Sequence, residues 1–536
     1  MTLQQTKRVL THLGYSIRKD ALTELETQAL RKALTVAPKT NNRFKRFGDS
    51  FTVFQESPQR FYVPRMWALE KYGPAEADIL VDGDPLREEL KFVGTPYDYQ
   101  EEIVTKFIDS GANGLICVPC GRGKTFMAIW TALRIGKKFM IIVDKEFLLQ
   151  QWSEELKALV PGIRIGILQS DLNQVDSEVL VQKGPGLLEL KEMCRKEKLK
   201  VSGTVEELKQ RLREKGIEVG AKLEKVEYDC TIAMIQTLVQ RDFAETQFRP
   251  FGFAVFDECH HLGASNFSRA LLKVQPKKML GLSATPTRDD GLTCVFEWFL
   301  GKPVHWEKTR EADPDVVVRR YDFQSEDDTY ASVPMDRMGE VILARLLTQV
   351  CESEERNEAI DALLEDLTRD SKRRILVLSE RKSHLERIER GLAESVTRGW
   401  YIGGMKEEVR EEGAKTAQVL LGTYAMASEA MNIKTLNTMI MASPRKKIEQ
   451  STGRILRVKK DAREVHPMII DIVDSHDVYQ NQWLKRRKYY KTCAYKIEVW
   501  DPVSKGWKEE SQRKTKKQAD AANSLEQATG CMILDD

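Results

Sequence analysis

Short, fully apolar runs recur along the middle of this chain, and each is followed by small or polar residues and then by a helical pattern. Runs that are apolar on both faces predict strands buried in parallel sheets, and their alternation with helices predicts an α/β fold. The runs form two series of about five strands each. The first series lies at 115–118, 139–143, 231–235, 253–256 and 279–283, and the second at 375–378, 418–421, 438–441 and 468–472.

Two such series predict two α/β domains in tandem, joined in the polar stretch 307–315. The first part of the chain lacks this alternation and predicts a small separate N-terminal domain. The expected boundaries are 1–88 for the N-terminal domain, 89–310 for the first α/β domain, 186–220 for a helical insertion within it, 311–476 for the second α/β domain and 477–536 for a basic C-terminal extension.

The composition is typical of a globular protein, with 41% hydrophobic and 31% charged residues in a chain of 536. It excludes a wholly disordered or collagen-like chain. No apolar run approaches the roughly 18 residues of a membrane helix, and the N-terminus lacks the apolar core of a signal peptide. The nine cysteines are an odd number scattered along the chain, which favours reduced thiols. We therefore expect an intracellular protein, cytoplasmic or nuclear, with no membrane partner.

The net charge of +3 carries little information about partners, but the charge is unevenly distributed. Between residues 485 and 517 there are 12 Lys and Arg residues against 4 Asp and Glu residues. Tyrosines and tryptophans alternate with these charges. The segment is open to two interpretations, a solvated tail or a surface that contacts phosphates.

A loop rich in glycine follows the first apolar run and precedes a helical pattern, which is the context of a phosphate-binding loop. Gly121 and Gly123 would let backbone N–H groups curl around phosphate oxygens at a helix N-terminus. Lys124 would reach the terminal phosphates, and the Thr125 hydroxyl would hold Mg²⁺. The pattern is incomplete because Val118 stands where a first glycine is usual.

An acidic pair, Asp257 and Glu258, follows the apolar run 253–256. A carboxylate at the carboxyl end of a parallel strand beside a phosphate-binding loop can hold Mg²⁺, which suits Asp257. Glu258 is placed to orient or deprotonate the attacking water. His260 and His261 are alternative metal ligands, but no Cys/His set with zinc spacing completes them.

With these two motifs the sequence resembles the superfamily 2 helicases of the DEAD/H-box type, in particular the XPB-like branch. GRGKT (121–125), DECH (257–260), SAT (283–285) and QSTGRILR (450–457) stand in the family's order, within a resemblance that spans about residues 90–475. It implies two RecA-like domains, with ATP and Mg²⁺ as cofactors. The resemblance implies that ATP is bound by Gln100, Gly121, Arg122, Gly123, Lys124 and Thr125, and that hydrolysis is catalysed by Lys124, Asp257, Glu258, Gln450, Arg454 and Arg457. It implies that ATP hydrolysis is coupled to nucleic-acid binding by His260, Ser283, Thr285 and Glu429. The nucleic acid itself would contact Gln151, Thr231, Gln236, Arg381 and Thr423.

The motif arginines Arg454 and Arg457 are expected one helical turn apart on the second domain, whereas the other catalytic residues lie on the first. A site divided in this way assembles only when the domains close, which would link hydrolysis to motion. The family usually has E-G-x-D in the motif that contains Glu429, but this chain has Asn432 at the last position. The amide keeps hydrogen-bonding capacity and loses the charge of a carboxylate.

Segments outside the motor motifs narrow the resemblance further. FYVPR (61–65), YIGGMK (401–406), the motif segment 422–437 and the ending at 469–491 resemble the helicases of nucleocytoplasmic large DNA viruses, a group that includes the poxvirus transcript-release helicase. This resemblance implies DNA as a partner, together with an RNA transcript and an RNA polymerase. It also implies the host cytoplasm and the virion as locations.

The segment 187–216 interrupts the α/β pattern with two short amphipathic helices, the second opened by a capping box at Thr204 and Glu207. It resembles a SAP domain, a small DNA-binding module. The basic residues that would contact DNA are Arg195, Lys196, Lys198 and Lys200. The alternative is a structural helical hairpin without a ligand.

These features predict an ATP-dependent DNA helicase or translocase that acts in transcription. One alternative is a translocase that strips RNA or protein from DNA without separating strands. Another is a DNA-binding scaffold that keeps a vestigial nucleotide site and does not hydrolyse ATP, although the acidic pair and the motif arginines argue against it.

Overall fold

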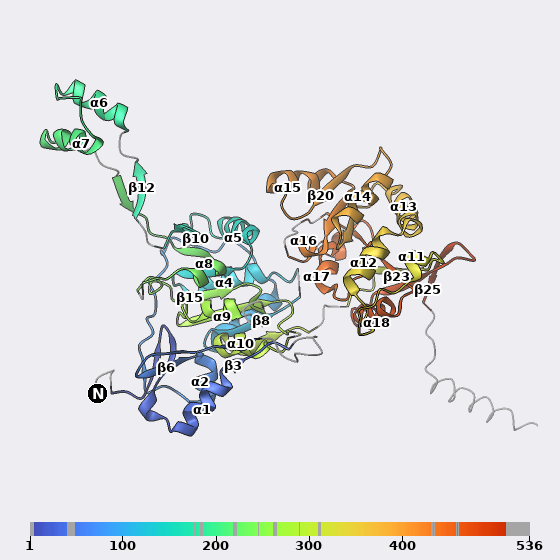
Figure 1. Ribbon diagram of the computed structural model, residues 1–536, viewed down its shortest axis with the longest axis horizontal. Helices are drawn as coiled ribbons and strands as arrows, with labels where there is room; N and C mark the ends of the chain where they lie inside the picture. Colours follow the sequence, from blue (N-terminus) through green and yellow to red (C-terminus); the bar gives the residue numbers. More distant parts are fainter. Residues whose placement is uncertain are drawn as a thin grey trace, which may run out of the picture. The chain divides into compact units, whose positions relative to one another are not determined.

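The computed structural model divides the chain into two compact units, Met1–Lys308 and Thr309–Asp536 (Figure 1). The division lies within the polar stretch 307–315. The residues that the structure describes are 5–39, 49–119, 121–175, 178–182, 186–217, 222–244, 246–260, 265–288, 290–308, 312–429, 433, 435–456, 458 and 460–510.

The N-terminal part of the first unit is a small mixed sheet in the order β5-β6-β2-β1-β7. Helix α1 (Glu24–Ala33) begins with a capping box formed by Thr23 and Glu26, and α2 (Arg65–Tyr72) follows β6. The strands are β1 (Arg8–Thr11), β2 (Gly14–Arg18), β5 (Gln55–Glu56), β6 (Arg60–Val63) and β7 (Ala77–Asp78), with a separate pair β3 (Thr35–Val36) and β4 (Phe51–Thr52).

Arg65 attaches this sheet to the α/β part of the unit. Its buried guanidinium donates to the carbonyls of Pro276 and Lys277 at 3.1 and 3.3 Å and to the Asn113 side chain at 3.0 Å. Burial lowers its pKa to about 10, but the group remains charged at neutral pH. The N-terminal part shares a hydrophobic core with the α/β part, and Arg65 adds hydrogen bonds that depend on the docked arrangement.

The first large sheet has the order β11-β10-β14-β9-β15-β16-β8-β17, and all its pairs are parallel except β10 with β11. Its central strands are buried along their length, as their apolar runs predict. The strands are β8 (Asn113–Cys117), β9 (Phe139–Val143), β10 (Ile165–Gln169), β11 (Leu172–Asn173), β14 (Cys230–Met234), β15 (Phe253–Phe256), β16 (Lys278–Ser283) and β17 (Pro303–Trp306). The helices are α3 (Asp98–Asp109), α4 (Lys124–Ile135), α5 (Glu146–Leu159), α8 (Ile235–Gln240), α9 (Ser265–Leu271) and α10 (Thr293–Leu300).

The insertion between β11 and β14 begins and ends with a two-stranded ribbon, β12 (Glu178–Gln182) and β13 (Lys222–Lys225). The ribbon leads to α6 (Leu187–Lys196) and α7 (Val205–Glu214), which pack on each other through their own small core (Figure 1). That core contains Leu190, Cys194, Leu208 and Leu212. The predicted capping box forms at Thr204 and Glu207.

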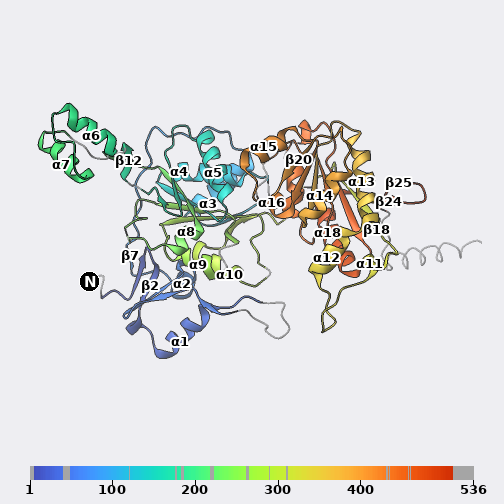
Figure 2. The same ribbon diagram turned by 45° about the horizontal axis from the view of Figure 1, so that its top comes forward.

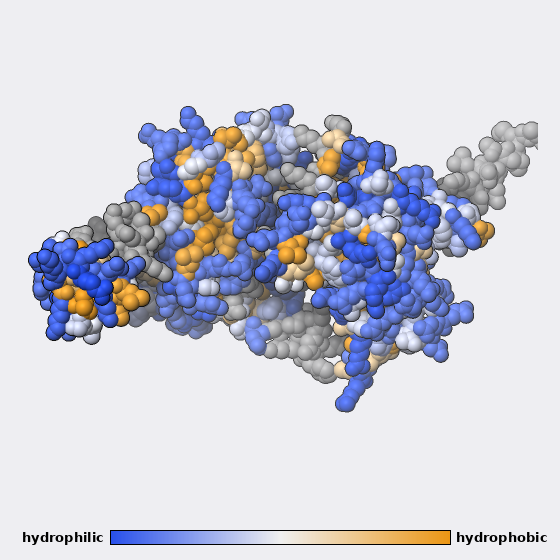
Figure 3. Space-filling model, turned by 90° about the horizontal axis from the view of Figure 1, so that it is seen from above, coloured by the Kyte–Doolittle hydropathy of each residue, from blue (hydrophilic) through white to orange (hydrophobic). Residues whose placement is uncertain are grey.

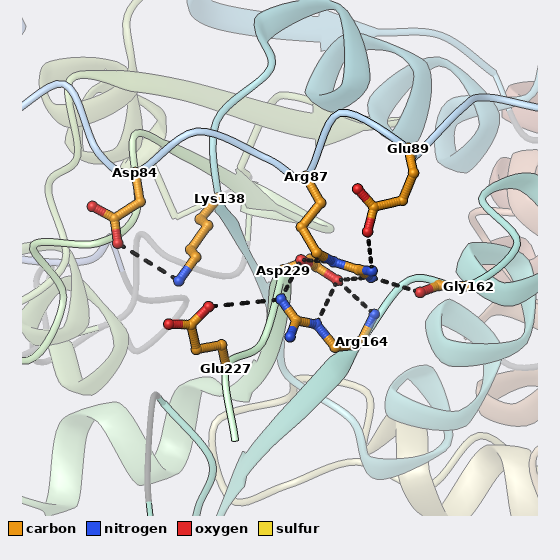
Figure 4. A network of polar contacts seen from close by, with 8 residues as sticks. All are labelled: Asp84, Arg87, Glu89, Lys138, Gly162, Arg164, Glu227 and Asp229. Carbon is orange, nitrogen blue, oxygen red and sulfur yellow. Dashed lines mark hydrogen bonds and ion pairs between the residues drawn. The ribbon is translucent and has the colours of Figure 1, made fainter. Parts of the chain in front are cut away.

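A charged network holds the base of this insertion (Figure 4). The buried Asp229, just before β14, accepts hydrogen bonds from Arg87 at 2.7 and 2.9 Å and from Arg164 at 2.8 to 3.3 Å. Burial opposes ionisation of Asp229, but these bonds outweigh it and lower the pKa of the carboxyl below its usual value. One carboxylate thus joins the segment before α3, the chain entering β10 and the strand after the insertion.

The second unit contains a second large sheet in the order β20-β21-β19-β22-β23-β18-β24-β25, parallel except for the last pair. Two such sheets confirm the predicted α/β fold class. The strands are β18 (Val317–Phe323), β19 (Ile375–Ser379), β20 (Arg398–Tyr401), β21 (Val419–Thr423), β22 (Thr438–Met441), β23 (Met468–Asp474), β24 (Lys496–Asp501) and β25 (Gly506–Glu509). The helices are α11 (Asp328–Ala331), α12 (Leu343–Glu352), α13 (Glu354–Thr368), α14 (Lys382–Gly391), α15 (Glu407–Thr416), α16 (Tyr424–Glu429), α17 (Glu449–Thr452) and α18 (Asp477–Thr492).

The interpretation of the basic C-terminal segment as a solvated tail is wrong for its described part, which ends at residue 510. Helix α18 buries Arg486 against Asp471 at 2.8 Å, and Tyr490 also donates to Asp471 at 2.9 Å. Strands β24 and β25 extend the large sheet. The sequence shows the basic charges but cannot show that a carboxylate on β23 pairs with one of them.

The visible surface is mostly hydrophilic, with hydrophobic residues gathered mainly on the first unit (Figure 3). No helix among the described residues is both long enough and apolar enough to cross a membrane.

Candidate nucleotide-binding and hydrolysis site

The phosphate-binding loop lies between the carboxyl end of β8 and the start of α4 at Lys124. Gly121 and Gly123 have φ values of 87° and 78°, in the region that favours glycine. A side chain at Gly123 would place its Cβ 2.4 Å from the Gln100 amide nitrogen. Backbone conformation and a close neighbour thus both require glycine next to the lysine.

Gln100 is buried, and both ends of its amide are engaged. Its Oε1 accepts from the Tyr97 backbone N–H at 3.0 Å, and its Nε2 donates to the Arg122 carbonyl at 3.2 Å. In this arrangement Gln100 positions the phosphate-binding loop, and its direct contact with the nucleotide stays a prediction. The Tyr99 hydroxyl donates to the same carbonyl at 3.3 Å.

Arg122 is fixed by contacts that the sequence did not predict. Its guanidinium lies 3.9 Å from the centre of the Tyr99 ring and makes two bonds of 3.1 Å to Glu307. Glu307 directly follows β17, the strand paired with β8. The pairing links the loop to the end of the first unit.

The acidic pair lies at the same edge of the sheet as the loop, because β15 and β8 both end there. Lys124 Nζ lies 3.2 Å from Glu258 Oε1. Asp257 accepts from the Glu258 backbone N–H and from the Trp152 indole N–H, both at 2.9 Å. The structure therefore brings Lys124, Asp257 and Glu258 together, and it adds Trp152.

Asp257 lies in a poorly hydrated position directly after β15. Burial raises its pKa to about 6, with a further contribution from the neighbouring Glu258. A divalent cation would offset both effects, and the hard oxygens of Asp257 and the Thr125 hydroxyl suit Mg²⁺. Within the described ranges no group of three or more His, Cys, Asp or Glu side chains is arranged to hold a metal, and His261 lies outside those ranges.

Glu258 has a φ of 42°, which is uncommon for a residue with a side chain and costs on the order of 1–3 kcal/mol. His260 Nδ1 lies 3.4 Å from the Glu258 carboxylate and 3.1 Å from the Ser283 hydroxyl, which in turn accepts from the Thr285 N–H at 3.0 Å. Three of the four residues predicted to couple the motifs, His260, Ser283 and Thr285, thus form a continuous chain of contacts with Glu258.

The predicted nucleic-acid contacts of the first unit differ in their accessibility. Thr231 is fully buried within β14, and its hydroxyl donates to the Gln174 carbonyl at 3.1 Å, so the prediction that it contacts nucleic acid is wrong. Gln236 donates to the Asp144 carbonyl at 2.8 Å. Gln151 is half-buried on α5. In the insertion, Arg195, Lys196, Lys198 and Lys200 are all exposed.

In the second unit, Arg454 is almost buried and its Nε donates to the Ala427 carbonyl of α16 at 2.6 Å. Helix α17 ends at Thr452, and Arg454 lies on the 3₁₀ turn Gly453–Ile455 that follows it. The expected spacing of one helical turn between Arg454 and Arg457 stays a prediction. Arg381 bonds the Thr348 hydroxyl and the Ala344 carbonyl, each at 3.2 Å, and Thr423 ends β21. Arg457 and Asn432, with the side chains of Glu429 and Gln450, lie outside the described residues.

Comparisons with known proteins agree with these motifs. Residues 94–288 match the family described as "Type III restriction enzyme, res subunit". A putative ATP-dependent RNA helicase of Acanthamoeba polyphaga mimivirus is 27% identical over 509 residues, which cover 92% of this chain and 87% of that protein. A putative ATP-dependent RNA helicase of African swine fever virus is 24% identical and covers 75% of this chain and 74% of its own.

A putative DNA 3'-5' helicase Rad25 from Halobacterium salinarum is 26% identical over 260 residues, which cover 47% of this chain and 34% of that protein. Residues 94–288 thus form a helicase domain of the matched type, and the chain as a whole is a helicase-type ATPase that is similar along most of its length to putative helicases of large DNA viruses.

Proposed function

We propose that this protein couples ATP hydrolysis to movement along DNA. The observation that carries the proposal is the arrangement of Lys124 and Glu258, 3.2 Å apart at the edge where Asp257 and the phosphate-binding loop meet. Phosphoryl transfer needs positive charge on the phosphates and a positioned water more than covalent chemistry, and these side chains supply both.

In the proposed mechanism, Lys124 leaves Glu258 to pair with the terminal phosphates of ATP. The Glu258 carboxylate then orients the attacking water and accepts its proton. Thr125 and Asp257 would hold Mg²⁺, which neutralises phosphate charge. Arg454 and Arg457 of the second unit are proposed to stabilise the transition state, with Gln450 orienting that motif.

The chain of contacts through His260, Ser283 and Thr285 supports a proposed coupling between ATP hydrolysis and nucleic-acid binding. His260 touches the side chain that would activate water, so any shift of Glu258 alters the bond to Ser283. We assign these residues, with Glu429, to coupling. Gln151, Gln236, Arg381 and Thr423 remain proposed contacts with the nucleic-acid strand.

The relatives differ in the nucleic acid that their names give, since the two viral proteins are named RNA helicases and the archaeal protein a DNA helicase. The insertion favours DNA for this chain. Its two helices, their own core and the exposed basic cluster fit a SAP-like DNA tether. Arg211 donates to the carbonyls of Lys200 and Ser202 at 2.8 and 2.7 Å and so fixes the link between the helices.

The resemblance to viral transcript-release helicases supports a role in viral transcription, with an RNA polymerase and a transcript as partners in the host cytoplasm. A polarity of 3′→5′ is what the resemblance to the XPB-like branch implies.

The deciding experiment is phosphate release from ATP by the full chain, alone and with duplex DNA, single-stranded DNA or single-stranded RNA of matched length. We expect DNA to stimulate turnover more than RNA. Strand separation and displacement of a bound transcript are then measured on the same DNA. ATP binding without turnover on any nucleic acid would instead indicate the non-hydrolysing scaffold.

A further inference from the structure

A cavity of about 570 Å³ lies where the N-terminal sheet meets the α/β part of the first unit. Its lining comes from the turn between β1 and β2, the segment after β7, and the loops at 242–251 and 273–276. None of these residues belongs to the nucleotide site. The walls are mainly apolar, with Leu13, Ile79, Val81, Phe243 and Phe248 among them.

Gln275 is the polar side chain that stands out in this lining. It is 4% exposed, and neither its amide nitrogen nor its amide oxygen has a hydrogen-bond partner within the described chain. A buried polar group of this kind lowers the stability of the fold as long as it is unpaired. Gly14 has a φ of 110°, and a Cβ there would lie 2.6 Å from the Val63 carbonyl oxygen and 3.1 Å from the Gln275 nitrogen, so this position beside the amide requires glycine.

The segment that borders the cavity continues the edge strand of the N-terminal sheet. Strand β7 is last in the sheet order and pairs only with β1 among the described strands (Figure 2). After it, Ile79 and Val81 are 44% and 46% exposed and, two residues apart, belong to one face of an extended chain. An exposed apolar edge of this kind pairs readily with another extended segment.

We propose that this groove binds an extended apolar peptide segment of a partner protein. The segment adds to the edge at β7, places one apolar side chain in the cavity and uses one backbone N–H and one C=O to satisfy the Gln275 amide. A peptide main chain presents this donor and acceptor pair at every residue, and pockets beside an augmented sheet select the alternate side chains.

The charges of the groove favour a peptide over nucleic acid. Its lining carries Asp242, Arg249 and Lys273, and Lys273 already donates to the carbonyls of Val239 and Arg241 at 3.3 and 2.6 Å. Asp78 and Asp82 flank the edge, and Asp82 pairs with Lys277 at 2.9 Å, so the flank carries no excess of positive charge. Binding along a phosphate backbone needs a surplus of positive charge, which these residues do not provide.

The test uses the full chain and a set of fluorescent octapeptides that alternate threonine with valine and carry leucine, phenylalanine, tyrosine or tryptophan at the centre. Binding is measured by fluorescence anisotropy. We expect a dissociation constant of about 10–100 µM for the best peptide. The analogue of this peptide with N-methylated backbone amides should bind at least about tenfold more weakly, because its main chain cannot donate hydrogen bonds.

Gln275→Leu and Val81→Lys should each weaken binding about tenfold while leaving ATP turnover unchanged. Leu25→Lys is the matched control, since Leu25 is an exposed apolar residue of α1 outside the groove. Amide hydrogen exchange at residues 79–82 should slow when the peptide is bound.

Equal affinity of the wild-type protein and both groove variants would overturn the proposal, as would no binding by any peptide at about 1 mM. An oligothymidylate that protects 79–82 and loses affinity in Gln275→Leu would assign the groove to nucleic acid instead. ATP turnover is measured separately, so the peptide proposal can fail while the proposed motor function holds.

Discussion

At the scale of single residues, the proposed mechanism gives Lys124 and Glu258 different roles, although their side chains lie in contact. Lys124→Ala should abolish turnover and weaken ATP binding, because the phosphates lose their nearest cation. Glu258→Gln should bind ATP at near wild-type affinity and lose hydrolysis, because an amide cannot accept the proton of the attacking water. Nucleotide binding and phosphate release are measured on both variants. Wild-type turnover in Glu258→Gln would show that another group is the base.

Asp229 illustrates a residue whose effect is on stability. Its pKa is lower in the folded protein than its usual value of 3.8, so its stabilising contribution is present above about pH 4 and is lost as the pH falls through the folded value. Asp229→Asn should cost about 2 kcal/mol at pH 7, because two arginines lose their charged acceptor. The difference from wild type should shrink in urea unfolding below pH 4.

Glu227→Gln is the control for this prediction, because Glu227 joins the same network through Arg164 at 3.9 Å but is 55% exposed. It should change stability by less than about 0.5 kcal/mol. A constant difference between Asp229→Asn and wild type from pH 7 to pH 3 would contradict the linkage.

At the scale of elements, the insertion is a unit with its own core. Its removal should therefore leave the α/β part of the first unit folded. Replacement of residues 187–216 by a short Gly/Ser linker leaves Asp229 and its arginines in place, and basal ATP turnover should survive. DNA affinity at low salt should fall. The dependence of log affinity on log salt should become shallower by about 0.9 for each DNA phosphate that the insertion no longer neutralises.

Neutralising the cluster tests the same idea without a deletion. Arg195, Lys196, Lys198 and Lys200 changed to Gln should give the same shallower salt dependence, since all four side chains are exposed and their replacement leaves the small core intact. Lys209→Gln with Arg213→Gln on α7 serves as the control. An unaltered salt slope with a lower melting temperature would favour the structural hairpin.

At the scale of the whole molecule, the proposed mechanism requires residues of the second unit for turnover of ATP bound by the first. Arg454→Ala should lower the maximal rate of DNA-stimulated turnover by about 100-fold, less than the loss of a sole transition-state arginine, because Arg457 would share the charge. ATP affinity should change little. A melting curve is the control, since Arg454 also bonds the Ala427 carbonyl. Unchanged turnover would contradict a role for Arg454.

The sequence by itself determined the elements whose physics is local. Apolar runs such as 139–143 and 253–256 became buried parallel strands, because a run without polar positions has no face to expose. Gly121 and Gly123 before Lys124 predicted a phosphate-binding loop, and both glycines have positive φ in the structure. The alternation of apolar runs with helical patterns predicted the α/β fold class. Shorter or mixed strands such as β10 and β17 were missed, because their residues show neither pattern.

Only the tertiary structure decided which side chains meet across long separations in sequence. Trp152 bonds Asp257, Glu307 holds Arg122, and Asp229 joins two arginines, although nothing in the local pattern marks these partners. Burial also determined which side chains can reach a ligand. Thr231 is buried and cannot contact nucleic acid, and the basic segment forms helix α18, which packs on the second sheet. A residue type limits the bonds that a side chain can make, but the partner and the loss of water that give those bonds their energy arise only when distant segments pack together.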